Sequence, residues 1–180
     1  MSINQRLIDT NILALEEGAK LLSVLKVDQY TEGFKPAFQS TIGAHFRHVL
    51  EHYRCFFNQM DSGRFCYDER ERDGALECDH AYANQTINQL IELFATLDHD
   101  KFDQPYTVDD EQSQGPVITN LQRELLFLQS HTVHHYAIIG AMTRAFGNMP
   151  ADDFGVAIAT RSHQKRNDND ANAGDTPCAQ

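Results

Sequence analysis

Residues 119–146 read TNLQRELLFLQSHTVHHYAIIGAMTRAF, and this stretch decides the fold. Apolar side chains recur along it at helical spacing, at Leu121, Leu125, Leu128, Ile138 and Met142. A repeat with this period indicates an amphipathic helix that turns one face to a core. Thr119-Asn-Leu-Gln122 has the spacing of a capping box. We therefore expect a helix that begins there and ends near Phe146.

Three segments before this stretch show the same apolar period. They are residues 4–26, residues 41–59, and a segment that follows an expected N-cap at Asp79 and runs to Leu97. No segment of comparable length has the alternating pattern of a strand. Four long amphipathic helices predict an all-α fold, a four-helix bundle.

The linker between the second and third helices is unusually long, from about residue 59 to residue 79. At roughly 3.3 Å per extended residue it reaches beyond the ~30 Å length of a 20-residue helix. A short linker would force the two helices to be antiparallel. The long crossover lets them run parallel.

Two regions lack a helical period. Residues 98–118 hold Pro105, Gly115 and Pro116, and the β-leaning pieces 106–108 and 117–119 suggest a small irregular or hairpin insertion before the last helix. Residues 161–180 are polar and rich in Asn, Asp and Ala. We expect a domain over residues 1–160, followed by a disordered C-terminal tail over residues 161–180.

The charge balance excludes several classes of partner. Fifteen basic and 26 acidic side chains give the 180-residue chain a net charge of −11, so its field repels nucleic-acid phosphates and anionic lipids. We expect neither nucleic-acid nor membrane partners. The opening Met-Ser-Ile-Asn-Gln-Arg resembles no signal peptide, and we expect a cytoplasmic protein. The cysteines lack Cys-x-x-Cys spacing, so no zinc ribbon is indicated.

Histidines carry the functional signal. Six of the nine fall in two clusters, namely His45, His48 and His52 in the second helix and His131, His134 and His135 in the last. Positions i and i+4 of a helix lie about 5 to 6 Å apart on one face, so His131 and His135 can aim at one point. A lone histidine in a helix is more often a hydrogen-bonded core residue. Two clusters favour a divalent metal site instead.

A helix packed opposite can supply a third imidazole. His48 is central on the second helix, and His45 or His52 can replace it. Zinc, nickel, iron and manganese ions all accept neutral imidazole. Three protein ligands leave open coordination positions, which is typical of a reactive site.

The remaining polar residues near the clusters are candidates for the pocket. His134 points about 100° away from its neighbour on the helix, so it is a rival partner for His131 at i+3, although the i+4 pair is preferred. Any of His45, His52 and His134 that is not a ligand is a candidate to line the pocket or orient a ligand. Glu124 lies two turns before His131 on the same face. It either joins the pocket or is a solvated acid near a helix start.

The segment 67–73, Tyr-Asp-Glu-Arg-Glu-Arg-Asp, alternates basic and acidic residues. Arg70 or Arg72 can clamp an anionic substrate near the pocket mouth, and Tyr67 is the residue most suited to face inward. The alternative is a solvated loop with exposed salt bridges, each worth about 0 to 1 kcal/mol.

The order Ser40-Thr-Ile-Gly-Ala-His-Phe-Arg-His48-Val-Leu-Glu-His-Tyr, followed by Ser130-His131-Thr-Val-His-His135-Tyr, resembles the DinB-like superfamily of small metal-binding proteins. The resemblance covers roughly residues 1 to 160 and extends to a bacterial branch of uncharacterised function. It implies an up-down-down-up four-helix bundle. It also implies that His48, His131 and His135 bind the metal.

Relatives in that superfamily include thiol-dependent transferases that use bacillithiol or mycothiol, and a maleylpyruvate isomerase. The resemblance and the open metal site together predict a metal-dependent enzyme, either a thiol-dependent transferase or a hydrolase. Its substrate would be a small molecule, and for a transferase a low-molecular-weight thiol. The alternative is a non-catalytic, stress-related protein that binds a metal or a small ligand. A homodimer is one option for its assembly. No residue stands out as the general base.

Overall fold

The computed structural model describes residues 1–33, 35, 37–111 and 115–173. The helices are α1 (Ile3–Leu22), α2 (Val27–Thr31), α3 (Ile42–Gln59), α4 (Ala75–Cys78), α5 (His80–Ala95), α6 (Leu121–Ala145) and α7 (Ile158–Ala173). Shorter elements are the 3-10 turns η1 (Met60–Ser62), η2 (Tyr67–Glu69) and η3 (His99–Asp103), and the strands β1 (Arg64–Phe65), β2 (Tyr106–Val108) and β3 (Val117–Thr119). The prediction of a mostly helical fold is confirmed. Within the described residues, none of the helices combines the length and apolar character needed to cross a bilayer.

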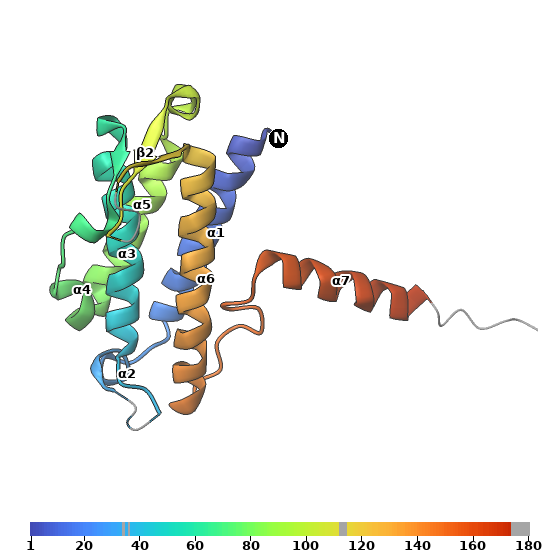
Figure 1. Ribbon diagram of the computed structural model, residues 1–180. Coiled ribbons are helices and arrows are strands. Elements are labelled where there is room, and N and C mark those ends of the chain that lie inside the picture. The colour runs from blue at the N-terminus through green and yellow to red at the C-terminus, as the bar shows by residue number, and fades with distance from the viewer. Residues whose placement is uncertain (34, 36, 112–114, 174–180) are drawn as a thin grey trace, which may run out of the picture.

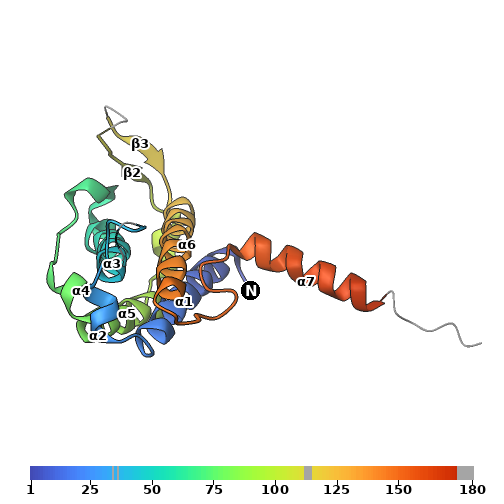
Figure 2. The same ribbon diagram turned by 90° about the horizontal axis from the view of Figure 1, so that it is seen from below.

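Four long helices surround one core (Figures 1 and 2). Helix α1 packs against α5 and α6, and α3 packs against the same two helices. Each contributes fully buried apolar side chains, for example Leu15, Phe46, Ile87 and Leu128. Burying such a side chain contributes roughly 1.5–3 kcal/mol, so this shared core holds the four helices together.

Contacts along the helices show their directions. Arg54 of α3 donates to Thr86, and Phe57 contacts Phe94 further along α5, so these two helices run the same way. The ring of His52 contacts Phe127, whereas the earlier His48 contacts the later His131, so α6 runs opposite to α3. Figure 1 shows α3 and α5 rising as α6 descends. The long crossover provides the chain length that this parallel pair requires.

A polar network crosses the centre of the core. Asn11 of α1 donates to the Leu125 carbonyl at 3.1 Å and accepts from the Tyr53 hydroxyl at 2.9 Å. The Thr132 hydroxyl of α6 lies 3.0 Å from the Tyr53 hydroxyl and donates to it. All three polar side chains are buried. Because a buried polar group left unpaired costs about 1–3 kcal/mol, this network fixes how α1, α3 and α6 align.

A three-stranded sheet lies beside the start of α6 (Figure 1). The hairpin expected from residues 106–108 and 117–119 is present, with Tyr106 opposite Thr119. Strand β1, which the sequence analysis did not predict, pairs in parallel with β2 through Arg64 and Thr107. A two-residue strand has too little sequence to show an alternating pattern. The sheet brings the chain that follows α3 close to the beginning of α6.

Helix boundaries differ in two places from those expected. The first helix ends at Leu22 rather than near residue 26, and a separate short helix, α2, follows. The last long helix has Asn120 as its N-cap, which accepts from the Arg123 backbone N–H at 2.8 Å. Thr119 was expected to take part in the cap. Its hydroxyl instead donates to Glu124.

The structure also differs from the disordered tail expected over residues 161–180. Helix α7 continues to Ala173, and residues 174–180 lie outside the described residues. The first turn of α7 is tied to α1 because Arg161 donates to both carboxylate oxygens of Glu17, at 2.6 and 2.9 Å. Such bidentate pairs are strong for their size. Beyond this anchor α7 extends away from the bundle (Figure 2).

We predict that Gly43→Ala destabilises the fold. A Cβ at this position would lie 2.1 Å from the Glu77 carbonyl oxygen and 2.9 Å from the Tyr30 ring. The backbone of α4 would have to move, at a cost of about 1–3 kcal/mol. Urea unfolding measures the change in the free energy of unfolding. Gly74→Ala is the control, since nothing lies within 4 Å of its Cβ, and equal stability of the two variants would contradict this packing.

Candidate metal centre

Three histidines converge where α3 crosses the middle of α6. His48 comes from α3, whereas His131 and His135 are one turn apart on α6. One ring nitrogen from each lies within 4.8 Å of the other two. The Nε2 atoms of His48 and His131 are 3.1 Å apart. The antiparallel packing of the two helices therefore gathers the three imidazoles at one point.

The donor set fits a divalent ion. Nitrogens that each lie about 2.0–2.1 Å from one ion are roughly 3 to 3.5 Å from one another. The His48 and His131 nitrogens already have this separation, and the His135 nitrogen lies no more than 4.8 Å from either of them. Each neutral imidazole offers one lone pair, so an ion between the facing Nε2 atoms of His48 and His131 would accept a lone pair from each.

Burial keeps these rings neutral. Burial first, and then the neighbouring imidazoles, lower the pKa of His131 to about 2 and the pKa of His48 to about 3. The pKa of His135 falls to about 4, first through burial and then through the nearby His45. Neutral imidazole is the form that binds metal ions, so the site presents its nitrogens in the required state.

The two alternative ligands on α3 lie on either side of this trio. His45 lies beside His135, with its Nδ1 atom 2.9 Å from Nδ1 of His135. His52 is buried, and its Nδ1 atom lies 2.7 Å from the backbone carbonyl of His48, to which it donates. That hydrogen bond leaves only Nε2 of His52 as an acceptor. The ring of His52 lies 4.2 Å from that of His131, centroid to centroid.

His134 lies outside the trio. Its side chain is exposed, and its ring meets that of His135 edge-on at 5.2 Å. The expected rotation of about 100° from its neighbour accounts for this position. It lies beside the cluster, on its exposed side.

Residues 14–139 match the DinB superfamily, a span that holds the second half of α1, all of α3 and α5, and α6 as far as Ile139, with all three converging histidines. The chain belongs to the DinB superfamily. This membership supports the resemblance drawn from the two histidine motifs. It also agrees with a metal-binding role for the cluster.

One curated protein illustrates the reach of the similarity. The chain is 30% identical over 105 residues to FK506-binding protein 5 of Rhizopus delemar, which covers 56% of this chain and 27% of that protein. The chain thus spans about a quarter of this relative's length. No solved structure matches the chain.

A cavity of about 250 Å³ adjoins the histidine cluster of this DinB-superfamily protein. His52 and Phe127 line it, and their rings lie 4.2 and 5.5 Å from that of His131. Tyr67 lines it too, with its ring stacked on His52 at 5.5 Å. The cavity is thus separated from the metal candidates by single rings. The Tyr67 side chain faces this cavity.

Glu124 is buried in the same cavity wall, at 2% exposure. It accepts from the Tyr67 hydroxyl at 2.8 Å and from the Thr119 hydroxyl at 2.6 Å. Burial and the charge of Glu124 both raise the pKa of Tyr67, so that hydroxyl stays protonated and donates. Of the two interpretations given to Glu124 above, the solvated surface acid does not fit this burial.

The two arginines expected to clamp a substrate lie elsewhere. Arg70 donates to the Tyr67 carbonyl at 2.8 Å, and its Nε lies 3.6 Å from Glu51. Its charge is close enough to lower the pKa of both His48 and His52, although burial is the larger cause. Arg72 is exposed and does not line the cavity. Neither arginine lies on the cavity wall beside Tyr67.

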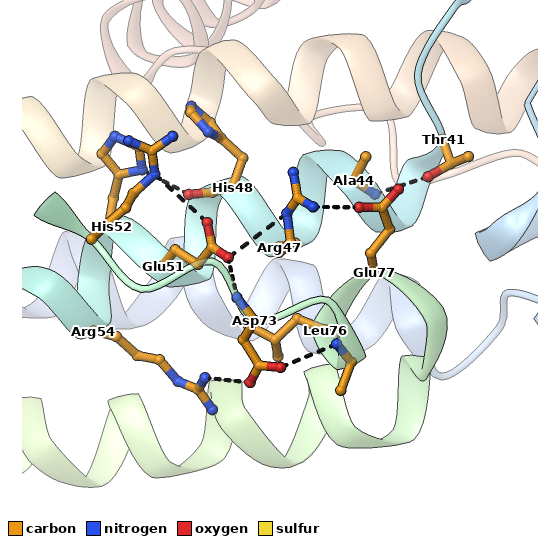
Figure 3. Close-up of polar contacts among 12 residues, drawn as sticks. Thr41, Ala44, Arg47, His48, Glu51, His52, Arg54, Asp73, Leu76 and Glu77 are labelled. Atoms are coloured by element: carbon orange, nitrogen blue, oxygen red, sulfur yellow. Dashed lines mark hydrogen bonds and ion pairs between the residues drawn. The ribbon is translucent and has the colours of Figure 1, made fainter. Parts of the chain in front are cut away.

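Sequence analysis missed Glu51, which ties the loop after α3 to the bundle. Its carboxylate is 2% exposed and accepts from the Asp73 backbone N–H at 2.8 Å. Figure 3 shows it between Arg47 and Asp73, beside His48 and His52. Burial raises the pKa of Glu51, opposed by the Asp73 N–H and by Arg47. A single acid beside His52 gives no periodic signal, so only the fold reveals its partners.

We predict that Glu51→Gln lowers the free energy of unfolding by about 1–3 kcal/mol, because Arg47 and Arg70 lose their buried counter-charge. Urea unfolding measures the loss. Glu77→Gln is the matched control, since this more exposed acid also pairs with Arg47 and is worth about 0–1 kcal/mol. A loss at Glu77 as large as that at Glu51 would count against this role.

Proposed function

We propose that this protein binds one divalent metal ion through His48, His131 and His135. The convergence of their ring nitrogens within 4.8 Å carries the proposal. Zinc, nickel, iron and manganese ions all suit a site of neutral imidazoles. His45 and His52, which were alternatives to His48, stand on either side of the trio and orient or enclose it.

We further propose that the site is enzymatic, with a thiol-dependent transfer or a hydrolysis as its reaction and a small molecule as its substrate. A metal ion held by three imidazoles keeps open positions at which it polarises a substrate or activates a water or a thiol. The cavity beside His52 and Phe127 supports this reading over a purely structural metal, because it gives a substrate room next to the site. Tyr67 and Glu124 in its wall supply polar contacts for binding.

The arrangement of the helices supports the same assignment. Gln122 of α6 donates to Asn4 of α1, and Asn11 donates to the later Leu125 carbonyl, so α1 and α6 run the same way. Together with the parallel pair α3 and α5, these directions support an up-down-down-up bundle. We propose that residues 1–160 form this unit. The parallel helices α1 and α6 are packed neighbours, as are α3 and α5, and the site lies between the antiparallel neighbours α3 and α6.

Metal content tests the ligand assignment. Protein purified without a histidine tag should hold one equivalent of a divalent ion by inductively coupled plasma mass spectrometry. His131→Ala and His135→Ala should lose it, with affinity reduced by more than the 10–100-fold typical of losing an outer partner of a ligand. His134→Ala is the matched control and should keep the ion, because that side chain is exposed. Retention of full metal in both ligand variants would refute the proposal.

Thermal stability gives a second test. An ion at about 100 times its dissociation constant stabilises the folded state by about 2.7 kcal/mol. For a chain of this size the melting temperature should rise by about 5–10 °C. Differential scanning calorimetry of metal-depleted protein, with and without added ion, measures the shift. A shift of equal size in His131→Ala would place the ion elsewhere.

A further inference from the structure

Two glutamates are buried to the same extent but differ in their charged neighbours. Glu51 and Glu124 are each 2% exposed. Glu51 has two cationic neighbours, with Arg47 and Arg70 nitrogens within 3.7 Å. Among the described residues, no lysine, arginine or histidine nitrogen lies within 4.0 Å of the Glu124 carboxylate. Burying a carboxylate is costly unless a cation pairs with it, so Glu124 lacks the compensation that Glu51 has.

Glu124 also has bonding capacity left. Its two oxygens accept one hydroxyl each, from Tyr67 and Thr119. A carboxylate offers about four lone-pair sites, so roughly two remain. Because Glu124 lines the cavity, a bound molecule can use them.

The other charged side chains that line the cavity are mostly negative, like Glu124. Three aspartates line it, Asp68, Asp109 and Asp110, against one arginine, Arg123. The guanidinium of Arg123 lies over the Phe127 ring, 5.7 Å from its centroid. Arg64 pairs with Asp109 and so offsets part of the negative field. The cavity therefore favours a positively charged occupant over an anionic one.

The geometry points to a substrate with a protonated amine, and we propose that Glu124 is the residue that selects it. This inference rests on the proposed metal site, which takes the reactive end of the same molecule. Glu124 is seven residues before His131, a rise of about 10 Å along α6. Glu124 thus binds the end of the substrate that lies farthest from the metal. Tyr67 and Thr119 are positioning residues that hold its carboxylate in place.

Three thiols that share the same six-carbon chain and differ only in the group at the other end test whether the site selects an amine. In 6-aminohexanethiol, 6-mercaptohexanol and 6-mercaptohexanoate the thiol is the end that binds a metal, and the other end is cationic, neutral or anionic. Binding to the cobalt-loaded protein is followed by the absorption that a thiol ligand adds to Co²⁺, and by calorimetry. The amine should bind at least about tenfold more tightly than the alcohol, and the carboxylate more weakly than either.

Glu124→Gln should abolish the preference for the amine over the alcohol, because it removes the charge that distinguishes the two ligands. Glu92→Gln is the control, because it removes the same charge from an exposed position on α5. The ranking of the three thiols on the unaltered protein does not depend on any variant being stable. An amine that binds no better than the alcohol to that protein would overturn the inference.

The outcome separates this inference from the metal proposal. If cobalt binds in one equivalent and the three thiols bind alike, the metal site stands and the selection by Glu124 is wrong. If no cobalt binds, the metal proposal fails. Calorimetry with n-hexylamine on the metal-free protein then decides the remaining question, since binding that Glu124→Gln abolishes supports the amine site and absence of binding refutes it.

Discussion

The alignment of α3 against α6 is the constraint on which the rest of the structure depends. His48 meets His131 on the outer side of this contact, and Tyr53 meets Thr132 on the core side. A slip of one helical turn, about 5.4 Å, would separate both pairs at once. The core network therefore does more than stabilise the bundle. Because its buried polar side chains are hydrogen-bonded to one another across the helices, it also holds the histidines in register.

The polar residues around the cluster divide into two sets with different physical roles. Glu51 and its arginines are charge-paired, and they attach the loop after α3 to the bundle. Glu124 and its donor Tyr67 line a cavity, Thr119 donates to the same carboxylate, and no cation pairs with Glu124 within the described part of the chain. Pairing makes the first set a structural support. The lack of a cationic partner makes the second set available to a ligand.

The small sheet links these sets. Strand β1 pairs with β2 of the hairpin, so the segment that carries Tyr67 lies next to the start of α6. This brings the Tyr67 hydroxyl within 2.8 Å of Glu124, although 57 positions separate them. A hydrogen bond of that sequence separation depends on the whole bundle being formed. The charged segment 67–73 by itself therefore gave no sign that Tyr67 and Glu124 are partners.

Periodicity alone determined the helical class, the position of the α6 helix and the capping role of Asp79, because these depend on neighbours three or four residues apart. The same spacing indicated His131 and His135 as a pair. Tertiary structure decided the rest. Which α3 histidine joins that pair depends on how two helices align, and the burial of Glu124 and the partners of Glu51 depend on contacts between distant segments. Such contacts leave no periodic trace in the chain, so only the packed bundle reveals them.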